Sequence, residues 1–138
     1  MKKALCLLII LYLAGCATLS DARNAKGQGT SHIYVASFDA VWNAIPKAVN
    51  EMDLNVVGEN KQEGYILAEK GWTGFSFGER VAVFVNKIDD NHIRVEVVSK
   101  KVMATNVLAY NWEQPIQDKL KEILKQQNLT KKEGAENN

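Results

Sequence analysis

Cysteine and histidine are the side chains best suited to nucleophilic or metal chemistry, and this chain has only two of each. The cysteines are Cys6 and Cys16, and the histidines are His32 and His92. A nucleophile needs a neighbouring base, and a zinc-type site needs about three or four protein ligands. With so few cysteine and histidine side chains we expect no catalytic residue, no metal site and no cofactor. We predict that the protein is not an enzyme. Both histidines are expected to be solvated strand residues.

The segment 70–80 (KGWTGFSFGER) combines glycines with aromatic residues. It lacks the Gly-Lys-Ser/Thr ending of a phosphate-binding loop, and no helix is predicted after it, so we attribute the glycines to turns. Trp72, Phe75 and Phe77 have two interpretations. They form an exposed patch for a partner or the bilayer, or they complete the core beneath the helices. We name these three residues as a candidate interaction patch.

The first residues have the pattern of an export signal. Two lysines follow Met1, and residues 4–13 (ALCLLIILYL) form an unbroken apolar run. A basic start, an apolar run of this length and small residues after it are typical of a secretory signal peptide. The run is too short for a spanning helix, which needs about 20 apolar residues. We therefore predict that residues 1–15 are a removable signal peptide.

The signal ends in Leu13-Ala14-Gly15-Cys16, which resembles the lipobox of bacterial lipoproteins. The resemblance implies that Cys16 carries a diacylglycerol on its sulfur, that the chain is cut before Cys16 and that the new amine is acylated. Several acyl chains together give durable membrane attachment. Ala17 stands where an Asp would imply inner-membrane retention, so the same resemblance implies the outer membrane, facing the periplasm. The alternative is an ordinary secretory signal with a chance cysteine.

Removal of residues 1–15 leaves 123 of the 138 residues, which is about one domain. The signal contains two of the 17 basic residues and no acidic one, so 15 basic and 16 acidic side chains remain. This near-neutral charge lacks the basic footprint of a nucleic-acid binder, and we expect no nucleic-acid partner. With Cys16 lipid-modified, no thiol is left for a disulfide, so the core itself has to hold the fold.

Polar, aperiodic segments lie on both sides of the patterned region. We predict a lipidated N-terminus and flexible tether over residues 16–30 and a disordered tail over residues 130–138. The folded α+β domain is expected between them, over residues 31–129.

Within that domain, the hydrophobic pattern changes from period 2 to helical and back. A helix is predicted after Ser37, where Ser serves as N-cap, and a second one opens at Asn111. Val81, Val83 and Val85 are expected to face inward with Ile93, Val95 and Val97, on two strands joined by a turn at residues 89–91. Strands are predicted over residues 31–37, 54–58, 64–69, 75–88 and 92–100.

The resulting order, β-α-β-β-β-β-α, predicts a two-layer α+β sandwich in which an antiparallel meander carries both helices on one face. This order, the helix opening S-F-D-A-V-W and the strand G-Y-I-L-A resemble small uncharacterised envelope lipoproteins. They are also similar to the helix-grip domains in the C subunit of the outer-membrane β-barrel assembly machinery. The likeness covers most of residues 31–129 and brings no active-site residue with it.

These observations lead to two functional hypotheses. The first is a membrane-anchored, periplasm-facing lipoprotein that acts as a non-enzymatic protein-interaction or envelope-assembly module, with another envelope protein as its partner. The alternative is a carrier of a small hydrophobic ligand in a cavity between sheet and helix. In that case Trp42, Phe84, Tyr110 and Trp112 are the expected lining.

Overall fold

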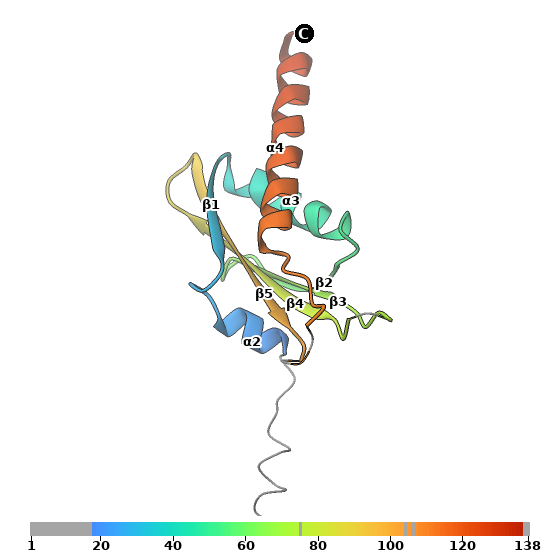
Figure 1. Ribbon diagram of the computed structural model, residues 1–138. Coiled ribbons are helices and arrows are strands. Elements are labelled where there is room, and N and C mark those ends of the chain that lie inside the picture. The colour runs from blue at the N-terminus through green and yellow to red at the C-terminus, as the bar shows by residue number, and fades with distance from the viewer. Residues whose placement is uncertain (1–17, 75, 104, 106, 137–138) are drawn as a thin grey trace, which may run out of the picture.

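The computed structural model describes residues 18–74, 76–103, 105 and 107–136. The predicted signal peptide, Cys16 and Phe75 lie outside the described residues. Figure 1 shows a twisted sheet with helical segments on both of its sides.

Five antiparallel strands form one sheet, in the order β1-β5-β4-β3-β2. Their bounds are β1 (Thr30–Val35), β2 (Asn55–Asn60), β3 (Tyr65–Lys70), β4 (Glu79–Lys87) and β5 (His92–Lys101). β2 to β5 follow one another as a meander, and β1 lies at the edge beside β5. The predicted α+β fold class with an antiparallel sheet is therefore confirmed.

The β4–β5 hairpin forms the centre of the sheet and matches the predicted alternation. Val83 lies opposite Val97, and the inward side chains of both strands are buried. At the turn, Asp89 Oδ1 accepts hydrogen bonds from the backbone nitrogens of Asn91 (2.9 Å) and His92 (2.8 Å). The Asn91 backbone bond, followed by the His92 side chain, holds the pKa of Asp89 below its usual value. A local carboxylate thus fixes the turn.

Helices α3 (Phe38–Asn50) and α4 (Glu113–Glu136) cover one face of the sheet, as predicted. Ser37 Oγ caps α3 by accepting a hydrogen bond from Ala40 N at 3.3 Å. The two helices bury an apolar stripe against the strands, made of Val41, Trp42, Ile45, Ala48, Val49, Ile116, Leu120, Ile123 and Leu124. The expectation of a disordered tail is wrong for residues 130–136, because α4 continues through them.

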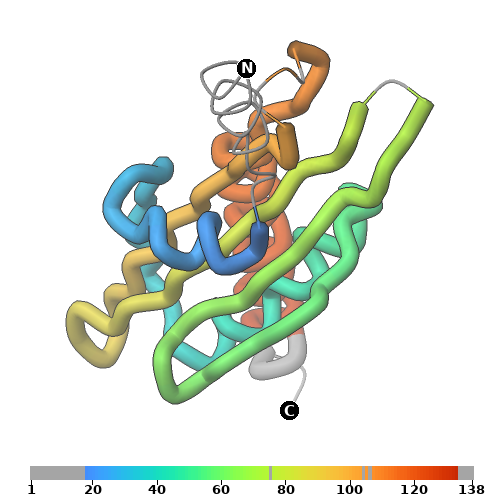
Figure 2. Tube along the Cα trace, turned by 90° about the horizontal axis from the view of Figure 1, so that it is seen from below, coloured from blue at the N-terminus to red at the C-terminus, as the bar shows by residue number. Residues whose placement is uncertain are grey.

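The segment 18–29 is folded, and the prediction of a flexible tether is wrong there. Thr18 caps helix α2 (Leu19–Asn24) in a capping box with Asp21, whose backbone nitrogen donates to Thr18 Oγ1 at 3.3 Å. Figure 2 shows α2, in dark blue, lying across the face of the sheet that α3 and α4 leave open. Its small side chains allow close packing of helix on sheet: Ala22 and Ala25 are buried against Ala82, Phe84 and Val98.

Two buried polar side chains fasten the N-terminal part of the domain. Glu96 on β5 is covered by the turn after α2, and its Oε1 accepts from Gly27 N (2.6 Å) and Gly29 N (3.0 Å). A Cβ on Gly29 would lie 2.1 Å from the Val97 carbonyl oxygen, so only glycine fits this close approach.

Gln117 of α4 is the second buried polar residue, and it joins three elements. Its Nε2 donates to the carbonyl oxygens of Thr30 on β1 (2.9 Å) and Val95 on β5 (3.0 Å). The Tyr34 hydroxyl donates to Gln117 Oε1 at 2.7 Å. The amide therefore has its donor and acceptor satisfied inside the core.

Candidate functional site: two apolar loops at one end of the sheet

Two connections meet at one end of the sheet: residues 71–78, between β3 and β4, and residues 102–112, between β5 and α4. We call their described residues the loop end. Val102 N donates to the carbonyl of Gly78 at 3.2 Å. The buried Glu79 carboxylate joins the same two segments, because its Oε1 accepts from Ser76 Oγ (2.7 Å) and Tyr110 N (3.1 Å).

The loop end exposes a set of large apolar side chains, which we call the apolar rim: Trp72, Phe77, Val107, Leu108 and Tyr110. Their exposed fractions are 73%, 52%, 85%, 66% and 56%. Of the two interpretations of the aromatic segment, burial in the core is therefore wrong for Trp72 and Phe77. The physical reason is that β4 begins at Glu79, four residues later than predicted, so these residues precede the strand that the helices cover.

A groove of 530 Å³ separates the loop end from the end of α3. It is lined by Met52, Asp53, Lys70, Thr73, Ser76, Glu79, Leu108, Tyr110, Trp112 and Pro115. The rings of Tyr110 and Trp112 meet edge to face, with centroids 4.7 Å apart. Trp112 Nε1 is buried and has no hydrogen-bond partner among the described residues.

Lys70 supplies the positive charge of this groove. Its Nζ lies 5.4 Å from the centroid of the Trp112 ring and 3.9 Å from Asp53 Oδ2, and it donates to the Met52 carbonyl at 3.5 Å. The groove thus combines an aromatic wall with a cation held at its edge. Such a surface suits an apolar group that ends in a polar or anionic head.

A comparison with models of protein families identified a family that matches most of the chain. The model of the family described as Protein of unknown function (DUF3568) matches residues 1–102. The chain belongs to this family. A comparison with curated proteins found no match. The region matched by the DUF3568 model includes α2, the whole sheet, Trp72 and Phe77, whereas the 103–112 part of the loop end and α4 lie beyond it.

The four aromatic residues expected around a carrier cavity do not come together in this DUF3568 domain. Trp42 belongs to the core under α3 and α4, whereas Phe84 packs against α2 on the opposite face of the sheet. Of the four, only Tyr110 and Trp112 share a surface, in the groove at the loop end.

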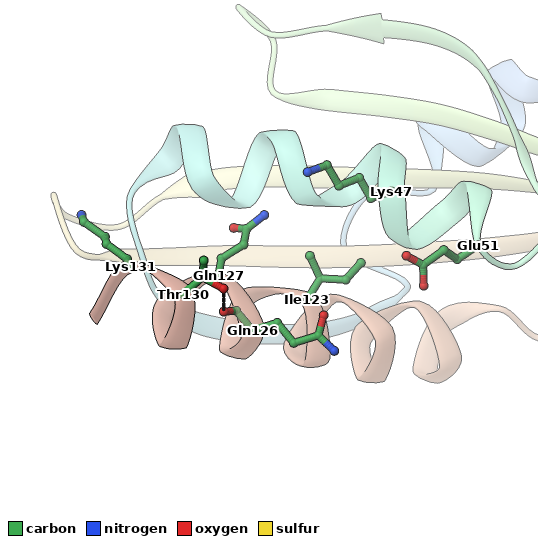
Figure 3. A pocket seen from close by; sticks show the side chains of 7 residues that line it. All are labelled: Lys47, Glu51, Ile123, Gln126, Gln127, Thr130 and Lys131. Carbon is green, nitrogen blue, oxygen red and sulfur yellow. Dashed lines mark hydrogen bonds between the residues drawn. The ribbon is translucent and has the colours of Figure 1, made fainter. Parts of the chain in front are cut away.

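A second groove, of 520 Å³, lies between α3 and α4 (Figure 3). Apart from Ile123, the residues that line it end in polar or charged groups: Lys47, Glu51, Gln126, Gln127, Thr130 and Lys131. The Thr130 hydroxyl donates to the Gln126 carbonyl at 3.1 Å, so it is held by its own helix. This groove presents charged and amide groups, in contrast to the apolar rim.

The histidines are exposed, as predicted. His32 lies on β1, and the His92 Nδ1 atom lies 2.9 Å from both oxygens of Asp89 at the β4–β5 turn. Within the part of the chain that the structure describes, no group of three or more His, Cys, Asp or Glu residues is arranged to hold a metal ion. Nor does any described helix have the length and apolar character needed to cross a membrane.

Proposed function

We propose that the protein is a lipoprotein of the bacterial cell envelope, anchored in the outer membrane through Cys16 and facing the periplasm, and that its domain is a non-enzymatic interaction module. The observation that supports this best is the position of the lipobox relative to the fold. Cys16 precedes Thr18, the cap of the docked helix α2, by two residues. An extended chain spans at most about 3.5 Å per residue, so the Cα atoms of Cys16 and Thr18 are within about 7 Å of each other.

The short connection determines how close the proposed anchor keeps the domain to the membrane. A lipid on Cys16 holds the domain directly against the membrane, because α2 packs on β3, β4 and β5 and leaves almost no free chain. The projecting end of α4 lies at the opposite end of the molecule (Figure 1). With its exposed Leu129 and the polar groove of Figure 3, that end is the surface available to another envelope protein.

The anchor is tested by replacing the modified cysteine. Wild-type protein expressed with radioactive palmitate is expected to carry label and to fractionate with membranes. The Cys16→Ser variant is expected to lose the label and to appear in the soluble periplasmic fraction. Cys6→Ser is the matched control: it changes the other cysteine, inside the predicted signal, and should leave labelling and fractionation unchanged. A Cys16→Ser protein that stays with membranes would contradict the proposal.

The interaction module is tested by photo-crosslinking in intact cells. A crosslinking amino acid at Leu129 on α4 is expected to capture one defined envelope protein, and deletion of residues 129–138 is expected to abolish co-purification of that protein. The same amino acid at Ser20, an exposed position on α2 four residues after Cys16, is the control site. Repeated recovery of the monomer alone from both sites would count against this function.

A second candidate function is supported by the groove at the loop end. Its aromatic wall and Lys70 suit a small amphiphile, so the protein would carry such a ligand on its surface instead of in a sheet–helix cavity. Native mass spectrometry of protein purified from membranes tests this candidate. A bound small molecule that is lost in Trp112→Ala is the expected result, and a spectrum of protein without adducts is the contrary one.

A further inference from the structure

We propose that the apolar rim is a second, non-covalent membrane contact: Trp72, Phe77, Val107, Leu108 and Tyr110 enter the interfacial layer of the bilayer that holds the lipid on Cys16. The inference rests on the proposed function, because the anchor defines which end of the domain faces the membrane. The proposal names the bilayer as the partner of this surface, whose five large apolar side chains are each more than half exposed. Soluble proteins seldom leave such a group uncovered.

The position of the rim supports this assignment. In Figure 1, α2 begins at the lower end of the molecule, level with the connection after β5 and with the β3–β4 loop, while α4 rises to the other end. Figure 2, seen from below, shows α2 nearest the viewer, and it shows that the orange connection after β5 and the β3–β4 loop lie at one and the same end of the sheet. Since Cys16 is within about 7 Å of Thr18, the bilayer surface lies beside this end.

The same distance argues against a protein as the occupant. A helix with its side chains is about 10 Å thick, which exceeds the reach of about 7 Å between Thr18 and the anchored residue. A partner as thick as one helix therefore does not fit between the start of α2 and the anchored residue.

The side-chain chemistry of the rim matches a membrane interface. Tryptophan and tyrosine concentrate at the headgroup level, where the ring is in an apolar layer and its polar atom meets water. Val107 and Leu108 lack polar side-chain atoms and suit the acyl boundary. Exposed Lys101 at the end of β5 adjoins the rim, and a lysine there can extend its charge to the headgroups.

The anchor also explains why a small rim suffices. A lipidated domain is already confined to the surface, so insertion of the loops is an intramolecular step with a high effective concentration. A patch too small to recruit a soluble protein can then hold an anchored one. Two attachments, Cys16 and the rim, orient the domain so that α4 points away from the membrane.

Fluorescence quenching in vesicles tests the contact. The full acylated protein is reconstituted in phosphatidylethanolamine–phosphatidylglycerol vesicles with and without bromine on the acyl chains. Trp42 is buried and Trp112 is partly buried, so Trp72 is the exposed reporter. We expect brominated lipid to reduce the emission of wild-type protein, and we expect this reduction to be lost in Trp72→Phe, which keeps an aromatic ring in the rim.

A relocated reporter is the matched control. The double variant Trp72→Phe, Leu129→Trp carries its exposed tryptophan on α4 and should show no bromine quenching. Flotation of the vesicles reports the anchor separately: a protein that does not float contradicts the lipoprotein assignment itself. A protein that floats while its Trp72 emission is the same in both kinds of vesicle overturns the membrane contact. Equal quenching in wild type and Trp72→Phe overturns it as well.

Discussion

At the scale of single residues, the domain depends on buried polar groups with complete sets of partners. Gln117 is almost fully buried and connects α4 to both β1 and β5 through its amide. A buried polar group left without its partner costs about 1–3 kcal/mol, more than the net gain from an ordinary hydrogen bond. The polar atoms around Gln117 therefore specify how α4 and the edge strand are placed.

Replacement of this amide tests that role. Gln117→Leu removes the donor to Thr30 and Val95, and we expect the free energy of unfolding to fall by about 2 kcal/mol. Gln114→Leu, three residues earlier on the exposed face of α4, is the matched control, with a change of no more than about 0.5 kcal/mol. Urea denaturation followed by circular dichroism measures both. Equal midpoints for the two variants would show that the buried amide contributes nothing specific.

Tyr34 gives the domain a pH dependence with a defined sign. Burial, with a smaller effect from the charge of Asp118, raises the pKa of the Tyr34 hydroxyl above its usual value. The unfolded chain releases this proton near pH 10, while the folded protein retains it, so the unfolded state binds fewer protons above that pH. The free energy of unfolding is thus expected to fall as the pH rises above about 10.

The Tyr34→Phe variant isolates this effect. It should lose about 1 kcal/mol at neutral pH, because the hydrogen bond to Gln117 is absent, and it should show a shallower decline above about pH 10. Urea titrations at a series of pH values from neutral to alkaline provide the measurement. Parallel declines in both proteins would mean that other groups cause the alkaline loss.

At the scale of elements, α2 is the feature that changes the interpretation of the chain. Ala22 is completely buried between the helix and the sheet, whereas Ser20 on the same helix is exposed. Ala22→Glu would place an unpaired charge in this contact, and we expect α2 to detach while the β4–β5 hairpin remains folded. Hydrogen exchange should show lost protection over residues 19–25 and unchanged protection over residues 81–85.

Ser20→Glu is the control for the Ala22→Glu exchange experiment. It adds the same charge to the first turn of α2, where a carboxylate suits the helix dipole, and should leave the exchange pattern as in wild type. Loss of protection in both variants, or in neither, would mean that the Ala22 contact does not hold the helix.

Elements differed in how well the sequence predicts them. The alternation around Val83 and Val97 indicated the central hairpin because one face of each strand is buried beneath helices. Helix α2 was missed because the only buried side chain within it is that of Ala22, and a single alanine leaves no hydrophobic period. The signal was present in Thr18 and Asp21, three residues apart, with Asp in place of the usual Glu or Gln. The loop end has no periodicity, so the exposure of Trp72 and Phe77 needed the structure.

At the scale of the whole molecule, the two ends of the domain contribute unequally to stability. Leu124 is the last residue of α4 that belongs to the core, and residues 128–133 are exposed. Deletion of residues 130–138 is expected to change the free energy of unfolding by less than about 1 kcal/mol. Leu124→Ala, which keeps the full length, should cost about 2–4 kcal/mol. A large loss on deletion would show that the projecting end of α4 has a structural role in the isolated domain.

The pairing of β1 with β5 has a consequence for the order in which the chain acquires structure. Thr30 lies beside Val97, and α2 rests on residues of β4 and β5, so the first elements to be synthesised wait for the last strand before they can dock. Contacts so distant in sequence form slowly, because a long loop has to close first. If the chain is exported as we propose, residues 18–29 would dock only after most of the polypeptide has crossed the membrane, and the lipobox would stay accessible to processing enzymes until then. Under the proposed function, this topology would place the processing of the N-terminus before the completion of the fold.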